Sequence, residues 1–129
     1  MQKSEIYVDR GLAYLALEKQ PEAISNFERA IELDRKNARA YYNRACTSHQ
    51  LGDLHSALTD LTEVLYLNPD SVSARANRGL IYHQLGHRQA ALQDLRFAAR
   101  HFDDRGNRAA SAQMQHLIDR VRQSGSALG

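Results

Sequence analysis

A four-residue segment, HQLG, occurs at His49–Gly52 and again at His83–Gly86, 34 positions later. The agreement continues without a gap on both sides, because Asn43-Arg44 returns as Asn77-Arg78 and Asp60-Leu61 returns as Asp94-Leu95. One further step back of the same length reaches a more diverged copy that contains Gly11 and Tyr14. A fixed period of this size is typical of stacked supersecondary units that cannot bury their apolar faces alone.

The size and composition of the chain are those of a globular protein. With 129 residues, 43% of them hydrophobic and 25% charged, the chain is predicted to form a single domain over residues 1–123. The single cysteine, Cys46, excludes an internal disulfide and a cysteine zinc cluster, which favours a reducing compartment and predicts a cytoplasmic location. The first residues do not resemble a signal peptide. The chain contains no run of 18 apolar residues, so no membrane span is predicted.

Charge is distributed unevenly along the chain. Residues 1–71 carry 8 Lys and Arg against 11 Asp and Glu, whereas residues 72–129 carry 9 Arg against 4 acidic residues. An arginine-rich half can favour binding to nucleic acid or to an acidic surface, and such binding is the alternative function. The arginines are spread out rather than clustered, which favours solvated helix faces, so we expect no nucleic-acid partner.

Apolar residues recur at helical spacing in seven segments. Three pairs of helices are predicted: 4–17 with 21–33, 38–51 with 54–67, and a helix that begins after Asp70 or Ser71 with 88–101. Gly52 and Gly86 suit helix C-termini, and Asp53 can cap the helix that follows it. A last amphipathic helix at 107–122 has no partner and is predicted to cover the helix before it, leaving residues 124–129 as a flexible tail.

The repeated pattern resembles the tetratricopeptide repeat. The matching residues are Tyr7, Gly11, Tyr14, Ala23, Phe27 and Ala30 in the first copy, Tyr41, Ala45, Ala57, Leu61, Val64 and Pro69 in the second, and Gly79, Tyr82, Ala91, Leu95 and Ala98 in the third. The resemblance implies repeats at 4–37, 38–71 and 72–105. It also implies an all-α fold, a right-handed superhelical array of antiparallel helix pairs, or α-solenoid.

Three features of the repeats lead to packing predictions. The small residues Gly11, Ala45 and Gly79 are expected to face Ala23, Ala57 and Ala91, so that paired helices approach closely. Arg44 and Arg78 stand where the family usually has leucine, and we expect them to pair with Asp60 and Asp94 across each helix pair. Ser48 replaces the tyrosine expected at its position, which predicts looser packing in the second repeat.

The resemblance also implies a concave groove in which the first helix of each repeat contacts an extended peptide or a partner helix. The residues that map onto this face are Val8, Leu12, Leu15, Arg39, Tyr42, Asn43, Cys46, His49, Ala76, Asn77, Leu80 and His83. Asn43 and Asn77 can each donate and accept hydrogen bonds, which suits a peptide main chain, although local bonds within the helices are an equal alternative.

The family's best-known recognition device is a set of lysines, arginines and asparagines that holds a peptide's C-terminal carboxylate. The corresponding positions in this chain are Val8, Leu12, Asn43, Ser73 and Asn77. Only Asn43 fits that pattern, so we expect this chain not to recognise chaperone tails.

Residues that suggest chemistry are few. His49 and His83 occupy equivalent positions, but zinc sites normally need three or four ligands, so no metal is predicted. Cys46 has only His49 as a nearby acid–base partner, and a role as a small apolar residue is favoured over a nucleophile. There is no phosphate loop, dinucleotide fingerprint, zinc-protease motif or nucleophile elbow, so neither an enzyme nor a cofactor is predicted.

The sequence therefore predicts a non-enzymatic protein–protein interaction module or adaptor that binds a protein or peptide partner. Nucleic-acid binding through the C-terminal half is the first alternative. Self-assembly is the second, because the end helices of so short an array can stack between copies and give a weak homo-oligomer.

Overall fold

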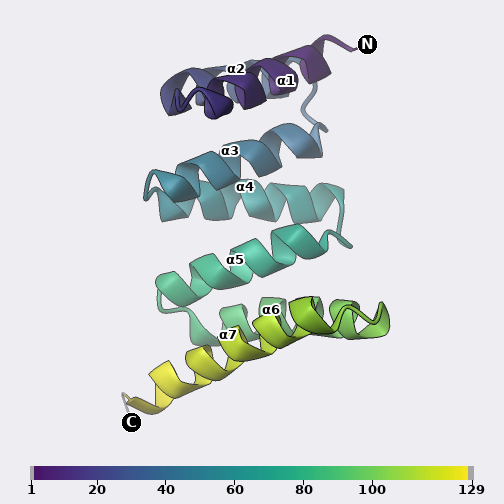
Figure 1. Ribbon diagram of the computed structural model, residues 1–129. Coiled ribbons are helices and arrows are strands. Elements are labelled where there is room, and N and C mark those ends of the chain that lie inside the picture. The colour runs from purple at the N-terminus through teal and green to yellow at the C-terminus, as the bar shows by residue number, and fades with distance from the viewer. Residues whose placement is uncertain (1, 128–129) are drawn as a thin grey trace. The chain divides into compact units, whose positions relative to one another are not determined.

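The computed structural model describes residues 2–127, and all regular secondary structure in this range is helical (Figure 1). The helices are α1 (Lys3–Ala16), α2 (Gln20–Leu33), α3 (Ala38–Gln50), α4 (Leu54–Leu67), α5 (Val72–Gln84), α6 (Arg88–Asp104) and α7 (Arg108–Ala127). The first five agree with the predicted helices to within one residue wherever both ends were predicted.

The last two helices are longer than predicted. Helix α6 continues to Asp104, and α7 passes residue 122 and reaches Ala127. The predicted tail at 124–129 is therefore helical as far as 127, while residues 128 and 129 lie outside the described part of the chain.

Polar side chains define several helix starts. The side chains of Asn37, Asp53 and Ser71 each accept a hydrogen bond from a main-chain N–H in the first turn of α3, α4 and α5, respectively. This confirms Asp53 as a cap and selects Ser71 over Asp70. Each bond satisfies an N–H group that has no partner within its own helix.

A residue in the left-handed conformation follows the first helix of each pair. Gly52 has φ 83° and Gly86 has φ 82°, a conformation that glycine adopts without a steric cost. The equivalent position in the first repeat is Glu18, whose φ is 59°. The turn geometry therefore recurs even where the residue is not glycine.

The chain divides into two compact units, Met1–Pro69 and Asp70–Gly129, called here the N-terminal and C-terminal units. Helices α1 to α4 belong to the N-terminal unit and α5 to α7 to the C-terminal unit. In the N-terminal unit α1 packs against α2, α3 packs against α4, and α2 contacts α3. In the C-terminal unit α6 packs against both α5 and α7.

An apolar cluster holds α1, α2 and α3 together. Its fully buried members are Val8, Ala23, Phe27, Ala30 and Ala40. A methyl group added at Gly11 would lie 2.4 Å from Cε1 of Phe27, so the absence of a side chain on α1 makes room for this ring. The ring, rather than Ala23, is the nearest group that Gly11 faces.

A buried polar network joins the same three helices. The Asn37 amide donates to Ser4 Oγ at 2.7 Å and to Glu5 Oε1 at 2.8 Å. Ser4 Oγ in turn donates to the Ala30 carbonyl at 2.8 Å. Because buried polar groups are costly unless they are paired, this network selects one arrangement of the helices. The repeat pattern does not predict this network.

The C-terminal unit has its own apolar cluster. It contains Ala91, Leu92, Leu95, Ala98 and Ala99 of α6 with Met114, Ile118 and Val121 of α7. The apolar stripe of α7 thus covers α6, which confirms the packing role predicted for the last helix. Across residues 2–127, no helix has the length and apolar character needed to cross a bilayer.

Candidate functional site

Helix α3 places five of the predicted groove residues along one side of the N-terminal unit. Tyr42, Asn43, Cys46 and His49 are half-buried, and Arg39 is exposed. Their spacing of three and four residues keeps them on neighbouring rows of the helix. The result is a strip that combines an aromatic ring, an amide, a thiol and an imidazole.

Arg39 and Asn43 are held by bonds to α1 and to their own helix, respectively. The Arg39 guanidinium pairs with Glu5 at 2.7 Å and Asp9 at 3.1 Å, both on α1. Asn43 donates through Nδ2 to the Arg39 carbonyl at 2.8 Å. The local bond that the sequence analysis left open therefore exists at Asn43, and it uses one of the two amide N–H groups.

Cys46 is a poor candidate for a nucleophile. Burial raises the pKa of its thiol, and a side-chain hydrogen bond involving Tyr42 opposes that shift only in part. The reactive species of cysteine is the thiolate, so the thiol remains protonated and weakly reactive at neutral pH. This supports the packing role predicted for Cys46.

Helix α1 contributes less than predicted. Val8 is fully buried in the cluster with Phe27, so its side chain cannot line an open surface, and its predicted place in the groove is wrong. Leu12 and Leu15 are half-buried and pack against the edge of that cluster. The family resemblance mapped Val8 onto the groove, but the structure gives this position of α1 to the core.

In the C-terminal unit the remaining predicted residues lie on α5. Ala76, Asn77, Leu80 and His83 are all half-buried. Ala76 packs against the α6–α7 cluster, so the side of α5 that carries Ala76 faces that cluster. Among the described residues no three His, Cys, Asp or Glu side chains are grouped as a metal site would require.

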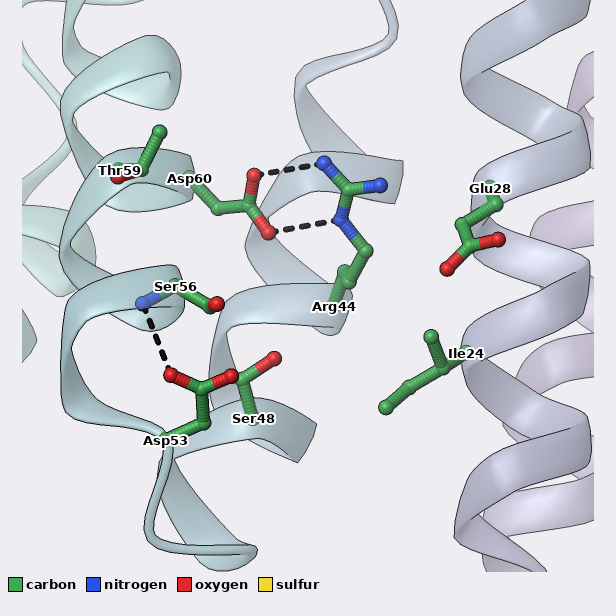
Figure 2. Close-up of a pocket in the computed structure, with 8 residues that line it drawn as sticks. All are labelled: Ile24, Glu28, Arg44, Ser48, Asp53, Ser56, Thr59 and Asp60. Carbon is green, nitrogen blue, oxygen red and sulfur yellow. Dashed lines mark hydrogen bonds and ion pairs between the residues drawn. The ribbon is translucent and has the colours of Figure 1, made fainter.

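The predicted Arg–Asp pairs are confirmed in both units. Arg44 donates through Nε and Nη2 to the two carboxylate oxygens of Asp60, both at 2.8 Å (Figure 2). Arg78 makes the same two-bond contact with Asp94 at 2.8 and 2.9 Å. Each aspartate is buried, so its charge depends on the arginine for compensation.

Arg75 is a third arginine that the repeat pattern did not explain. The equivalent residues in the first and second repeats are Tyr7 and Tyr41, and the Arg75 guanidinium lies over the Phe97 ring, 4.4 Å from the centroid. Its Nη1 reaches Asp94 Oδ1 at 3.4 Å, while its Nε is buried without a hydrogen-bond partner. Stacking on the ring thus replaces the expected aromatic contact.

Sequence reasoning missed a polar pocket in the N-terminal unit. It has a volume of about 410 Å³ and is lined by Ile24, Glu28, Arg44, Ser48, Asp53, Ser56, Thr59 and Asp60 (Figure 2). Hydrogen bonds from the side chain and main chain of Ser56 lower the pKa of Asp53, which is therefore ionised at neutral pH. The signal that could have located the pocket was Ser48 in place of a tyrosine.

Comparison with protein families gives matches to two repeat models. One, described as TPR repeat, matches residues 11–52, and another, described as tetratricopeptide repeat, matches residues 38–71 and 72–98. The chain belongs to the tetratricopeptide-repeat (TPR) family. The three-copy pattern, the helix pairs and the fold class predicted from the sequence are thereby confirmed.

Solved TPR domains share the fold of the whole chain. The first TPR of Spaghetti (RPAP3), bound to the HSP90 peptide SRMEEVD, has a TM-score of 0.85 at 21% identity, over 97% of this chain and 94% of that one. The TPR2B domain of yeast Sti1, in a pHsp70 complex, also has a TM-score of 0.85 at 21% identity, over 96% and 99%. At this identity the likeness establishes an all-α TPR solenoid.

The curated relatives match a shorter stretch. Serine/threonine-protein phosphatase 5 of Homo sapiens is 42% identical over 59 residues, which are 46% of this chain and 12% of the phosphatase. The similarity thus spans about an eighth of that protein.

Proposed function

We propose that this TPR chain is a non-enzymatic protein–protein interaction module that binds an extended peptide or a helix of a partner. The observation that carries the proposal is the strip on α3, where Tyr42, Asn43, Cys46 and His49 remain half-exposed on a helix whose opposite side is buried. Solved domains of the same fold hold an HSP90 peptide and a pHsp70 segment, which supports a polypeptide as the partner class.

The chemistry of the strip suits a polypeptide. Tyr42 offers an aromatic face with a polar end, a combination enriched at protein interfaces. Asn43 keeps its amide oxygen and one N–H after bonding to Arg39, so it can still pair with a main chain. On α5, Asn77 and Leu80 offer a similar amide and apolar combination. Each face carries residues that the family resemblance implies for partner binding.

The proposed partner does not carry a chaperone-type C-terminal carboxylate. Such a group needs cationic partners, yet Val8 and Leu12 stand at two of the positions that would supply them, and Val8 is fully buried. Arg39, the arginine on this face, is already neutralised by Glu5 and Asp9. We therefore propose recognition through apolar and amide contacts, in a cytoplasmic setting, by one domain of three repeats over residues 1–123.

The alternatives have less support. Of the nine arginines after residue 71, Arg75 and Arg78 are engaged by Asp94, which leaves fewer for a phosphate backbone. Weak self-association remains a prediction that sedimentation at two protein concentrations would test.

The proposal is tested by affinity capture from native lysate with quantitative mass spectrometry. The double variant Tyr42→Ala with Asn77→Ala should capture at least tenfold less of each specific partner protein, because it removes the aromatic contact and one amide. The control is Tyr66→Ala, since Tyr66 is 81% exposed on α4, outside the predicted face. Undiminished capture by a double variant with the wild-type helical content would refute the proposal.

A further inference from the structure

The pocket beside Ser48 lies at a position that carries an aromatic side chain in both other repeats. A shift of 34 residues takes Ser48 to Tyr82, and the same shift backwards takes it to Tyr14. In the second repeat alone, the side chain at this position is a single hydroxymethyl group. Ser48 is buried and lines the pocket, and the exposed residues Glu28, Asp53, Ser56 and Thr59 border the side that opens to solvent (Figure 2).

The C-terminal unit shows how a ring is held at this position. The Arg78 guanidinium lies over the Tyr82 ring at 5.6 Å from its centroid. The His87 ring meets Tyr82 edge-on, with centroids 5.9 Å apart. Arg78 is at the same time fixed by its two bonds to Asp94. The ring thus packs on a cation whose orientation is set by a buried carboxylate.

The N-terminal unit has the same cation without a ring at position 48, while the Arg44 guanidinium lies over the Tyr41 ring, 5.9 Å from its centroid. Arg44 corresponds to Arg78, is held by Asp60 in the same two-bond geometry, and lines the pocket. Asp53, which corresponds to His87, also lines it. Two residues whose counterparts contact the Tyr82 ring therefore border an open volume of about 410 Å³. A cavity of about 150 Å³ is enough to hold benzene, so a ring with its flanking main chain fits.

The charge at the pocket adds a second requirement. Three carboxylates, Glu28, Asp53 and Asp60, face a single guanidinium, that of Arg44. Asp60 is paired with Arg44, which leaves an excess of negative charge from Glu28 and Asp53 at neutral pH. A ligand that carries a positive charge next to its ring is therefore favoured over one that carries a negative charge.

We infer that the pocket at Ser48 binds an aromatic side chain of a partner polypeptide, a tyrosine next to a basic residue, in the place that Tyr82 fills within its own repeat. The ring stacks against the Arg44 guanidinium, and the neighbouring cation lies toward Glu28 and Asp53. The inference rests on the proposed function in one respect, that the ring belongs to a polypeptide. The site lies between α2, α3 and α4 and is separate from the α3 strip of Tyr42 and Asn43.

The test uses short tyrosine probes on the full chain, so it does not depend on knowing the partner. N-acetyl-tyrosinamide is titrated while the amide signals of Ser48 and Ser56 are followed by NMR. We expect saturable shifts, with N-acetyl-leucinamide giving at least fivefold weaker binding. Among dipeptide probes, N-acetyl-Arg-Tyr-amide should bind about threefold more tightly than N-acetyl-Glu-Tyr-amide.

Filling the pocket from within supplies the decisive variant. Ser48→Tyr should abolish probe binding, because the chain then supplies its own ring. Ser48→Met, with a flexible side chain, serves if the tyrosine variant does not fold. The control is Ser124→Tyr, which adds a ring to an exposed position of α7.

The inference is overturned if the wild type shows no saturable shift, if the filled variants bind as the wild type does, or if the leucine or Glu-Tyr probe binds equally well. A negative probe result combined with intact partner capture would remove this site and leave the proposed function standing.

Discussion

At the scale of single residues, the Arg44–Asp60 pair is a part-buried ionic contact that joins α3 to α4 in the second helix pair. The Asp60 side chain is 7% exposed and that of Arg44 is 26% exposed, so removing the arginine leaves a buried carboxylate uncompensated. We expect Arg44→Ala to lower the free energy of unfolding by about 2–4 kcal/mol. Urea denaturation followed by circular dichroism measures this change.

A double-mutant cycle separates the pair from its surroundings. Arg44→Ala combined with Asp60→Ala should cost less than the two single changes together, with a coupling of at least about 1 kcal/mol. The control is Arg29→Ala, since the Arg29–Glu32 pair is exposed at 51% and 65% and its loss should change the free energy of unfolding far less than the loss of Arg44 does. Strictly additive effects at positions 44 and 60 would contradict the pairing.

At the scale of elements, close packing of α1 on α2 reverses the usual effect of a glycine substitution. Within a helix, Gly→Ala normally stabilises by about 0.5–1 kcal/mol. At Gly11 the added carbon would lie 2.4 Å from the Phe27 ring, which is fully buried and cannot swing out. We expect Gly11→Ala to destabilise by about 1–3 kcal/mol in urea denaturation.

The matched change is Ser25→Ala on the exposed side of α2, which should alter stability by no more than about 0.5 kcal/mol. A stabilised Gly11→Ala protein would mean that the two helices do not approach as closely as the structure has them.

The elements were predictable where the repeat period and helical spacing determine them. The helix pairs and both Arg–Asp pairs follow from residues that recur 34 positions apart. The caps at Asp53 and Ser71 follow from residue types that favour the position just before a helix. The Ser4–Asn37 network does not recur in this way, and no local pattern marks it. Val8 was misplaced because the family resemblance maps it onto the position of Tyr42 and Ala76, and equivalent positions in different repeats need not be equally exposed. Ser48 in place of a tyrosine predicted loose packing in the second repeat, but the repeat pattern did not show that Glu28 of α2 and Asp53 would border the space.

At the scale of the whole molecule, each unit has an apolar cluster of its own. A substitution that disrupts one cluster should therefore destabilise the unit that contains it before the other unit. Val121 is fully buried in the α6–α7 cluster and Val8 in the cluster of the first three helices. We expect Val121→Asp, which buries an unpaired charge, to remove hydrogen-exchange protection from residues 88–127 while α1 and α2 keep theirs.

Val8→Asp provides the reciprocal experiment and should expose α1 to α3 to exchange while leaving α6 and α7 protected. Loss of protection in both units together, under conditions that favour folding, would show that the chain opens only as one cooperative body.

The positions of the caps determine where a single repeat can be excised for protein engineering. A fragment cut at residues 38–71 would leave behind Asn37, the residue that closes the start of its first helix, and would end in Ser71, which serves the following repeat. Moving both joints one residue toward the N-terminus keeps each helix with its own cap, a difference of about 1 kcal/mol for each joint. For a modular scaffold assembled from this chain, the exchangeable cassette therefore begins with the asparagine.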